Sequence, residues 1–394
     1  MKLHKPLVEA VISCLKQIVL DNKYSDRVLE KTFKANPKWG SRDRKFIAES
    51  VYDITRHFRY LSYLADTEKS FNMIVAAYFF EKGIPFPEWP DFQTINTKPF
   101  EIKKKQAGSP AILHSYPDEL WEICESELGK EKWLKEAEVM NQQAGVILRV
   151  NTLKTQKNEL IKKLLAEEIE VDPINIFKDA LQLRKRQNIF SSKLFLDGLF
   201  EVQDAGSQLI APFLNVEPGQ KVIDACAGGG GKSLHLSALM QNKGKIIALD
   251  VEEWKLENLK KRAKRAGVNN IEAQLITDKT IDQLKNYADR LLLDVPCSGI
   301  GVIKRNPDAK WKLNKEVIEK TKVLQYKILK DYSAMLKPGG YLVYSTCSIL
   351  PSENEKQVAK FTEEQNGAFE LIQDKTLYPS EGFDGFYMAL LKKN

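Results

Sequence analysis

The second half of the chain alternates strand-like and helix-like segments, and this pattern restricts the fold more than any other feature. Short β-rich apolar runs are each followed by a segment with helical spacing of apolar residues or by a turn. Such alternation is typical of a doubly wound parallel sheet covered by helices. We expect strands at 221–226, 245–250, 271–276, 290–295 and 341–346, and helices at 232–242, 252–266 and 317–336.

Two cysteines follow the last two of these predicted strands. Cys297 lies in Asp294-Val295-Pro296-Cys297, and Cys347 lies in Ser345-Thr346-Cys347. Crossovers between parallel strands are right-handed, so all the predicted strands end at one edge of the sheet, where open sheets bind their ligands. Two thiols at this edge favour a reaction of a thiol. For Cys14, Cys124 and Cys226 we expect the ordinary role of a small buried side chain.

A run of four glycines follows the first predicted strand, in Cys226-Ala227-Gly228-Gly229-Gly230-Gly231-Lys232-Ser233. Glycines permit positive φ angles and a close approach of a ligand to the backbone, and the next helix offers its positive N-terminal end. The tail Gly231-Lys232-Ser233 matches a phosphate-binding loop, but Cys226 stands where that motif needs its first glycine. An NTPase is therefore the weaker alternative, and an adenosyl ligand without a polyphosphate is favoured.

Three aspartates stand at or just after successive predicted strand ends: Asp250, Asp278 and Asp294. In dinucleotide folds, an acidic residue at the end of the second strand accepts hydrogen bonds from the ribose hydroxyls. Asp250 holds this position, and Asp278 could accept from an adenine amino group. Each aspartate alone is explained equally well as a helix cap or turn residue. A nicotinamide enzyme stays open, although the G-x-G-x-x-G spacing is poorly met.

Composition limits the class of protein. With 394 residues, 43% of them apolar and 29% charged, the chain is long enough for two or three globular domains. It contains no apolar run of membrane-spanning length and does not begin like a secretory signal, so we expect a cytoplasmic protein with no membrane partner. Five cysteines at irregular spacings and four histidines predict reduced thiols and no metal.

Four segments differ in pattern. Residues 1–82 show helical spacing throughout and predict a helical domain. Residues 83–113 are polar and interrupted by Gly and Pro, which predicts a linker. Residues 114–200 mix helical and strand-like signals, including 146–150 and 180–183, as in a small α+β domain. Residues 201–394 form the domain with the predicted parallel sheet.

The formal net charge of +7 suggests an acidic partner, with nucleic acid the commonest, although solubility alone explains such an excess equally well. The basic residues are clustered, which favours the nucleic acid. We interpret the cluster at 255–265 mainly as a solvated helix face. Lys304 and Arg305 are candidate contacts to phosphate, with solvated loop charge as the alternative. We expect a monomer.

Together these motifs resemble the RNA (cytosine-5)-methyltransferases of the Nop/Sun type, which use S-adenosylmethionine. The segments that match are Gln203-Asp204, the cofactor loop 224–233, the two cysteine motifs and the closing strand at 385–389, in the family's order. The cofactor loop departs from the family at two points. Gly228-Gly229 replaces the usual Ala-Pro, and Ser233 replaces Thr. The extra freedom of glycine is expected to weaken or slow cofactor binding.

The upstream half resembles the bacterial small-subunit rRNA branch of this family. Residues 41–46 and 51–52 resemble its NusB-like RNA-binding domain, 116–117 and 148–152 resemble its small domain, and 301–311 follows its sequence closely. The resemblance implies a Rossmann-like S-adenosylmethionine-dependent methyltransferase domain, preceded by an all-helical NusB-like domain and a small α+β domain. A bundle that serves packing alone is the alternative for residues 1–82.

The resemblance also implies a role for each candidate residue. Carbon 5 of cytosine accepts a methyl group only after a thiolate adds to carbon 6, and the family assigns that nucleophile to Cys347. Asp294 would hold the base and act as general acid, and Cys297 would assist release. Lys232 either begins a helix or orients a group in the site. The cofactor would contact the loop from Cys226 to Lys232 and the aspartates Asp250, Asp278 and Asp294.

The implied substrate is RNA, specifically 16S rRNA of the small subunit. Enzymes that modify a base edge act on unpaired or flipped nucleotides, so we expect a cytidine outside an intact duplex. A protein of another class remains as the alternative, namely a ribosome-assembly factor that binds rRNA without turnover.

Overall fold

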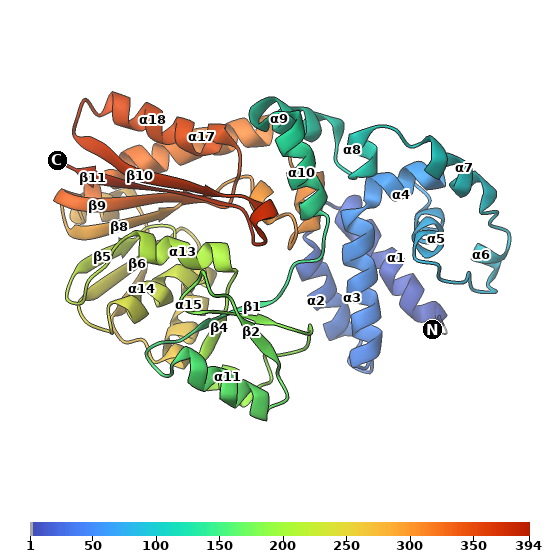
Figure 1. Ribbon diagram of the computed structural model, residues 1–394, viewed down its shortest axis with the longest axis horizontal. Helices are drawn as coiled ribbons and strands as arrows, with labels where there is room; N and C mark the ends of the chain where they lie inside the picture. The colour runs from blue at the N-terminus through green and yellow to red at the C-terminus, as the bar shows by residue number, and fades with distance from the viewer. Residues whose placement is uncertain (1–2) are drawn as a thin grey trace. The chain divides into compact units, whose positions relative to one another are not determined.

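The structure is a computed structural model that describes residues 3–394, with the side chain of Asp278 left out (Figure 1). The chain divides into two compact units. Residues up to Gln143 form the first unit together with Ile303–Lys315, and Ala144–Val302 form the second together with Glu316–Asn394. The second unit holds both β-sheets. The domain bounds expected from the sequence stay a prediction.

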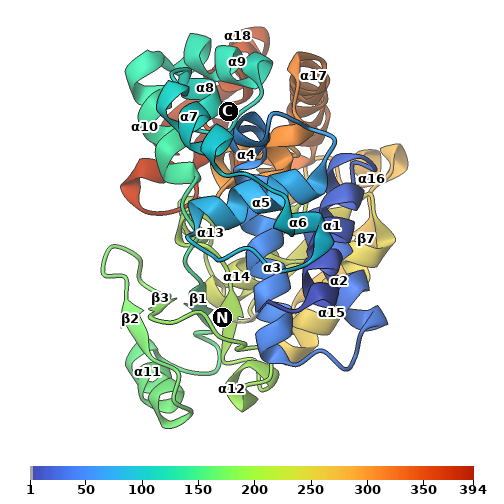
Figure 2. The same cartoon turned by 90° about the vertical axis from the view of Figure 1, so that its right-hand side faces the viewer.

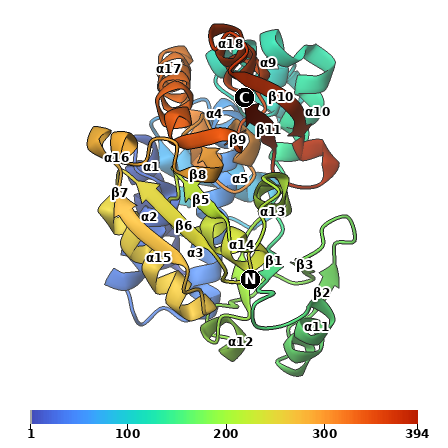
Figure 3. The same cartoon turned by 90° about the vertical axis from the view of Figure 1, so that its left-hand side faces the viewer.

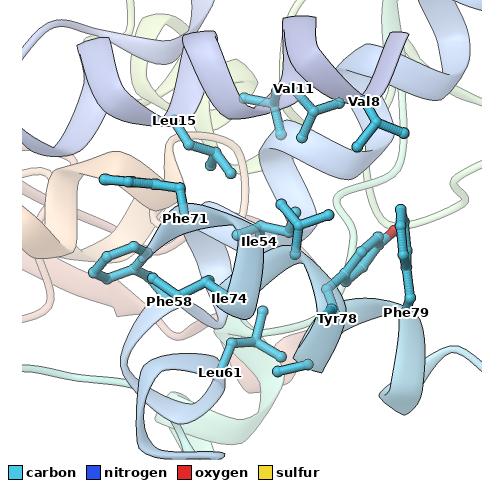
Figure 4. Close-up of a cluster of buried hydrophobic side chains, with 14 of the residues drawn as sticks. Val8, Val11, Leu15, Ile54, Phe58, Leu61, Phe71, Ile74, Tyr78 and Phe79 are labelled. Carbon is cyan, nitrogen blue, oxygen red and sulfur yellow. The ribbon is translucent and has the colours of Figure 1, made fainter. Parts of the chain in front are cut away.

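The first unit begins with helices, as predicted for residues 1–82. Figure 2 shows α1 packed with α2 and α3. Helix α5 is apolar on all sides, which is typical of a buried helix, and seven of its eleven residues are buried. Its side chain Phe71 lies near Leu15 of α1, and Ile74 lies beside Phe58 in the same core (Figure 4). The helices are α1 Lys5–Val19, α2 Ser25–Ala35, α3 Ser41–Arg56, α4 Phe58–Ala65 and α5 Phe71–Glu81.

The segment predicted as a linker carries three short helices, α6 Pro90–Gln93, α7 Lys98–Gln106 and α8 Pro110–Leu113. Each has a proline in its first turn, where the missing N–H costs nothing. Phe92 and Phe100 belong to the same core as α1–α5. Three prolines of the segment predicted as a linker therefore lie in the first turn of a helix, whereas Pro85 and Pro87 lie between helices. The unit continues with α9 Asp118–Leu128 and α10 Lys130–Met140, and it includes the 3-10 helix η2 Pro307–Trp311.

The large sheet of the second unit has seven strands in the order β10-β11-β9-β8-β5-β6-β7. Strands β5 to β9 are parallel, so the five predicted parallel strands are confirmed. Strands β10 and β11 run antiparallel at one edge. The bounds are β5 Lys221–Asp224, β6 Lys245–Asp250, β7 Ile271–Leu275, β8 Ala288–Asp294, β9 Leu336–Thr346, β10 Phe369–Leu377 and β11 Phe386–Lys393.

The sequence did not predict β10. Only its end residues, Phe369 and Leu377, are buried, and the residues between them are exposed or partly exposed. An edge strand whose two faces are both exposed to solvent shows no alternation of apolar and polar residues, and a strand is recognised in a sequence by that alternation.

Helices cover both faces of the large sheet (Figure 3). Alternate residues of β8 point to opposite faces. Leu291 and Leu293 pack with α17 and α18, whereas Leu292 packs with α13 and α14. This two-sided burial confirms the predicted fold class of a Rossmann-like sheet. The helices are α13 Ala205–Phe213, α14 Gly231–Leu239, α15 Glu253–Ala266, α16 Asp278–Gln283, α17 Lys315–Tyr332 and α18 Glu355–Glu364, with 3-10 helices η1 Ile300–Val302, η3 Ser333–Met335, η4 Pro351–Glu353 and η5 Pro379–Glu381.

A second, antiparallel sheet has the order β2-β3-β1-β4. Two of its strands fall where the sequence predicted them, and α11 packs over the sheet through Leu160 and Leu164. The elements are β1 Ile147–Val150, α11 Lys157–Ala166, β2 Val171–Pro173, β3 Ala180–Leu183, α12 Lys193–Leu196 and β4 Phe200–Val202. Across residues 3–394, every helix is too short or too polar to cross a lipid bilayer.

Candidate active site

The glycine loop connects β5 to α14, as predicted. Gly228 and Gly230 have φ angles of +53° and +84°, which L-residues adopt only with strain. A Cβ atom on Gly230 would lie 2.6 Å from Cγ of Leu259, whereas a Cβ on Gly228 would meet no atom within 4 Å. Packing therefore requires glycine at position 230, and the space beside Gly228 is open.

Three polar side chains hold this loop in shape. The backbone N–H of Gly228 donates to Oδ2 of Asp250 at 2.9 Å. Nη1 of Arg262 donates to the carbonyl of Gly229 at 2.7 Å, and Nη1 of Arg149 donates to the carbonyl of Gly231 at 2.6 Å. Both arginines are at most half-exposed. The loop is thus preformed by residues from three separate strands and helices.

The basic run at 255–265 was interpreted as a solvated helix face, and the structure corrects this for its two arginines. The carboxylate of Glu201, which is 3% exposed, accepts from Arg262 at 3.0 Å and from Arg265 at 2.6 Å. Periodicity could not reveal this pairing, because Glu201 lies more than 60 residues away in the sequence.

Asp250 ends β6, as predicted, and it is 7% exposed. Its Oδ1 accepts from the N–H of Glu252 at 2.9 Å, while Oδ2 holds Gly228. Each carboxylate oxygen has a further lone pair to offer a hydroxyl. Asp278 is the first residue of α16 and follows β7, but its side chain lies outside the described part of the chain. Its predicted contact with adenine stays a prediction.

Asp294, at the end of β8, forms a partly exposed ion pair with Lys232. Nζ of Lys232 lies 2.6 Å from Oδ2 of Asp294, and the hydroxyl of Ser345 donates to Oδ1 at 2.9 Å. Burial opposes the charge of Lys232, but the Asp294 carboxylate outweighs it and raises the pKa of the lysine. Lys232 therefore both begins α14 and orients Asp294, so the two alternatives for it are compatible. The sequence analysis did not single out Ser345, although it lies in the second cysteine motif.

The two predicted reactive cysteines lie side by side at the ends of adjacent parallel strands. Their Sγ atoms are 3.1 Å apart, and the N–H of Cys347 donates to Sγ of Cys297 at 3.2 Å. Both thiols are free and partly exposed. The hydrogen bond with Cys347, together with burial, raises the pKa of Cys297 well above that of an ordinary thiol. Cys297 is thus held as a neutral thiol.

Cys14 and Cys124 are fully buried in the first unit, as expected, whereas Cys226 is partly exposed and the expectation of a buried side chain is wrong for it. Desolvation still raises the pKa of Cys226 well above its ordinary value. Lys304 and Arg305 belong to the first unit as well. Lys304 is 9% exposed, and its carbonyl accepts from Arg56 at 3.1 Å. Their contact with phosphate stays a prediction. Within residues 3–394, no group of three or more His, Cys, Asp or Glu side chains is arranged to hold a metal ion.

Comparison with known proteins identifies two segments of the chain. Residues 211–392 match the family model described as 16S rRNA methyltransferase RsmB/F. Residues 116–190 match the ferredoxin-like domain of the same methyltransferases. The first match contains all three predicted catalytic residues, and the second covers most of the predicted small α+β segment.

A curated relative from Synechocystis, described as a probable ribosomal RNA small subunit methyltransferase B, is 34% identical over 299 residues, which are 71% of this chain and 67% of the relative. Across such relatives the match spans 49% to 67% of the relative's own length. Among solved structures, PH0851 matches with a TM-score of 0.82 at 24% identity over 100% of both chains. NSun6 from Pyrococcus horikoshii, solved with SFG, matches with a TM-score of 0.66 at 23% identity over 71% of this chain and 99% of that one.

The structural neighbours have the same fold as this chain, and the curated relatives are similar to it in sequence. The family is one of S-adenosylmethionine-dependent methyltransferases, so the cofactor that the sequence predicted is confirmed at this level. With the family model on the catalytic half and a relative covered over two thirds of its length, the chain belongs to the RsmB/F family of 16S rRNA methyltransferases.

Proposed function

We propose that this protein transfers a methyl group from S-adenosylmethionine to carbon 5 of a cytidine in small-subunit rRNA. The observation that carries the proposal is the pair of sulfur atoms, 3.1 Å apart, that follow β8 and β9, while Asp294 at the end of β8 pairs with Lys232. Two thiols and a carboxylate at the ligand edge of a parallel sheet fit a reaction that needs a nucleophile, a proton donor and a group for release. Membership of the family supports the substrate class.

The donor fits the residues present. The open space beside Gly228 gives a ligand access to the loop backbone, and Asp250 offers acceptors to ribose hydroxyls at the end of β6. When bound there, S-adenosylmethionine supplies an electrophilic methyl group. The chain itself orients the acceptor base and activates it.

Activation of the base begins with Cys347. Its thiolate adds to carbon 6 of the cytosine, which moves electron density to carbon 5. A thiolate at Cys347 is among the charges that raise the pKa of Lys232, so the ammonium group lies within electrostatic reach of the nucleophile. Asp294 accepts from the exocyclic amine and, when protonated, donates to N3 as the ring gains electrons. Ser345 and Lys232 fix the orientation of this carboxyl group.

Release reverses the addition. After methyl transfer a water molecule takes the proton from carbon 5, and the electron pair of that bond re-forms the double bond between carbons 5 and 6. The bond between carbon 6 and Sγ of Cys347 breaks with its electron pair on the sulfur, and N3 returns its proton to Asp294. Cys297 lies 3.1 Å from that sulfur and is held as a neutral thiol, so it can donate a proton to it. The substrate is an unpaired or flipped cytidine, because a base edge in an intact duplex is out of reach. We place this reaction in the cytoplasm, with the protein acting as a monomer.

The test measures methyl transfer from radiolabelled S-adenosylmethionine to rRNA transcribed in vitro, with variants of the two cysteines. Cys347→Ala should abolish methyl transfer and leave donor binding nearly intact. Cys297→Ala should accumulate a protein–RNA adduct that survives denaturation. Cys124→Ala, which removes a buried thiol of the first unit, should retain turnover. Full activity in Cys347→Ala would reassign the nucleophile, and a wild-type protein that binds rRNA without turnover would instead be an assembly factor.

A further inference from the structure

A buried acidic side chain, Glu353, lies directly against the turn that carries Cys297. Glu353 ends η4, six residues after Cys347, and none of its surface is exposed. Its Oε1 accepts from the N–H of Ser298 at 2.8 Å, and its Oε2 accepts from the hydroxyl of the same residue. A buried carboxylate is costly unless several donors satisfy it, so this arrangement is a specific one.

The other side of Cys297 is held through Gln325 of α17, which is also fully buried. Its Nε2 donates to the carbonyl of Pro296 at 2.9 Å and to Oε1 of Glu353 at 2.9 Å. Glu353 is therefore connected to the residue before Cys297 and to the residue after it. The position of the Cys297 sulfur depends on this carboxylate.

The neighbouring residue, Asn354, holds the turn of Cys347 in the same manner. Its Oδ1 accepts from the hydroxyl of Thr346 at 2.6 Å, and its Nδ2 donates to the carbonyl of Ser348 at 3.0 Å. Thr346 and Ser348 are the residues on either side of Cys347. Glu353 and Asn354, which are consecutive in the sequence, thus each hold the turn that carries one of the two cysteines.

The backbone of the same segment is fixed to the sheet. The hydroxyl of Tyr344 in β9 donates to the carbonyl of Glu353 at 2.7 Å, and Tyr344 is fully buried. Since both side chains extend from one rigid point, a change in either is expected to move one sulfur relative to the other.

We propose that Glu353 and Asn354 form a two-residue clamp that sets the position of the Cys297 and Cys347 sulfurs relative to each other, and that both are positioning residues for the release step. The role in release rests on the proposed function, whereas the placement of the sulfurs does not. Neither residue touches the reacting atoms. Glu353 acts through Ser298 and Gln325, and Asn354 acts through Thr346 and Ser348.

The charge of Glu353 gives the clamp a chemical signature. After the Cys347 hydrogen bond and burial, the carboxylate of Glu353 is a further cause of the raised pKa of Cys297. Glu353→Gln keeps the shape but removes the charge, and its amide cannot accept from both donors of Ser298. The variant should therefore ionise Cys297 at lower pH and loosen its turn. A merely structural residue would not shift the ionisation of one chosen thiol.

The experiment measures alkylation of each cysteine by iodoacetamide in the full chain as a function of pH, with the modified peptides quantified by mass spectrometry. Only the thiolate reacts, so each unit of fall in pKa raises the rate about tenfold below the midpoint. Glu353→Gln should raise the rate at Cys297 at least about threefold and change Cys347 less. Asn354→Ala should change the alkylation rate of Cys347 more than that of Cys297. Glu355→Gln, the same change on an exposed residue of α18, is the matched control and should alter neither.

Equal rates in Glu353→Gln and Glu355→Gln would overturn the clamp, as would an effect of Glu353→Gln spread evenly over both cysteines. If Glu353→Gln loses its cooperative thermal transition, Ser298→Ala decides, because it removes one donor to the carboxylate and keeps the backbone bond. It should raise the Cys297 rate by less, and an unchanged rate there would also overturn the clamp. Assays of the denaturation-resistant protein–RNA adduct in the same variants measure the release step. A wild-type protein without methyl transfer refutes the proposed function and leaves the alkylation result standing.

Discussion

Gly230 offers the sharpest test of the cofactor loop, because the structure separates two costs of placing a side chain there. Its φ of +84° strains any L-residue, and a new Cβ would lie 2.6 Å from Cγ and 3.1 Å from Cδ1 of Leu259. Leu259 is 1% exposed and packs against Ala227 and Ala248, so it has no free space into which to move. Gly230→Ala must therefore displace either the loop or the core beneath it.

The size of the effect follows from these two costs. The left-handed conformation costs about 1–2 kcal/mol for an L-residue. Overpacking a closed core costs about 1–3 kcal/mol more. The smaller conformational freedom of alanine in the unfolded chain returns about 0.4–1 kcal/mol. We expect a net loss of about 1–5 kcal/mol, which lowers either the free energy of unfolding or the affinity for the donor, depending on whether the loop relaxes.

Gly228→Ala is the matched control, because its φ of +53° imposes a similar strain while its Cβ would meet no atom within 4 Å. In the absence of the donor, the unfolding free energies of the two variants should differ by the overpacking cost alone, about 1–3 kcal/mol. The assay is urea unfolding of both variants without donor, and calorimetric titration with S-adenosylmethionine reports the loss of binding in Gly230→Ala. Equal losses in the two variants would refute the reasoning, because they would show that Leu259 does not define the loop.

Three further predictions concern the groups around this loop. Asp250→Ala should weaken donor binding by about 1.5–3 kcal/mol through loss of a charge-assisted hydrogen bond, and an unchanged dissociation constant would remove the ribose assignment. Arg262→Lys should weaken it about 2- to 12-fold, because lysine can keep the pair with Glu201 but not the second bond to Gly229; calorimetry checks this, and full affinity would count against it. Burial raises the pKa of Asp224 to about 7, above its unfolded value, so its contribution to stability is present at low pH and is lost as the pH rises through about 7. Urea unfolding of Asp224→Asn at about pH 5 and about pH 8 should show a smaller fall than the wild type, and an identical fall would contradict the burial argument.

The sequence predicted the parts of the fold that carry a periodic signal. The parallel strands β5 to β9 were placed within a few residues, because buried strands read as continuous apolar runs between turn residues. The short helices in the segment predicted as a linker were not predicted, because a proline in the first turn of a helix and a proline in a loop cannot be told apart in the sequence. The exposed edge strand β10 has no pattern to find.

The same distinction applies to the site. Cys297, Cys347, Asp250 and Asp294 were predicted because they follow strands, and topology brings strand ends together without any knowledge of side-chain packing. The long-range polar contacts were not predicted. Glu201 pairs with arginines more than 60 residues away, and Glu353 bonds with Ser298 across 55. No local pattern distinguishes such a carboxylate from a solvated one.

The two kinds of residue also carry different kinds of information about the reaction. A cysteine after a strand end favours a reaction of a thiol, but two thiols in one site leave open which of them would attack. The surrounding contacts bear on that choice: Cys297 accepts from the N–H of Cys347, and the turn that carries Cys297 is held by the buried carboxylate of Glu353 in η4. The hydrogen bond with Cys347, burial and the negative charge of Glu353 all raise the pKa of Cys297 and so favour its neutral thiol. We therefore expect Cys297 to stay protonated when Cys347 attacks, and Glu353, which no local sequence pattern singles out, to contribute to that difference.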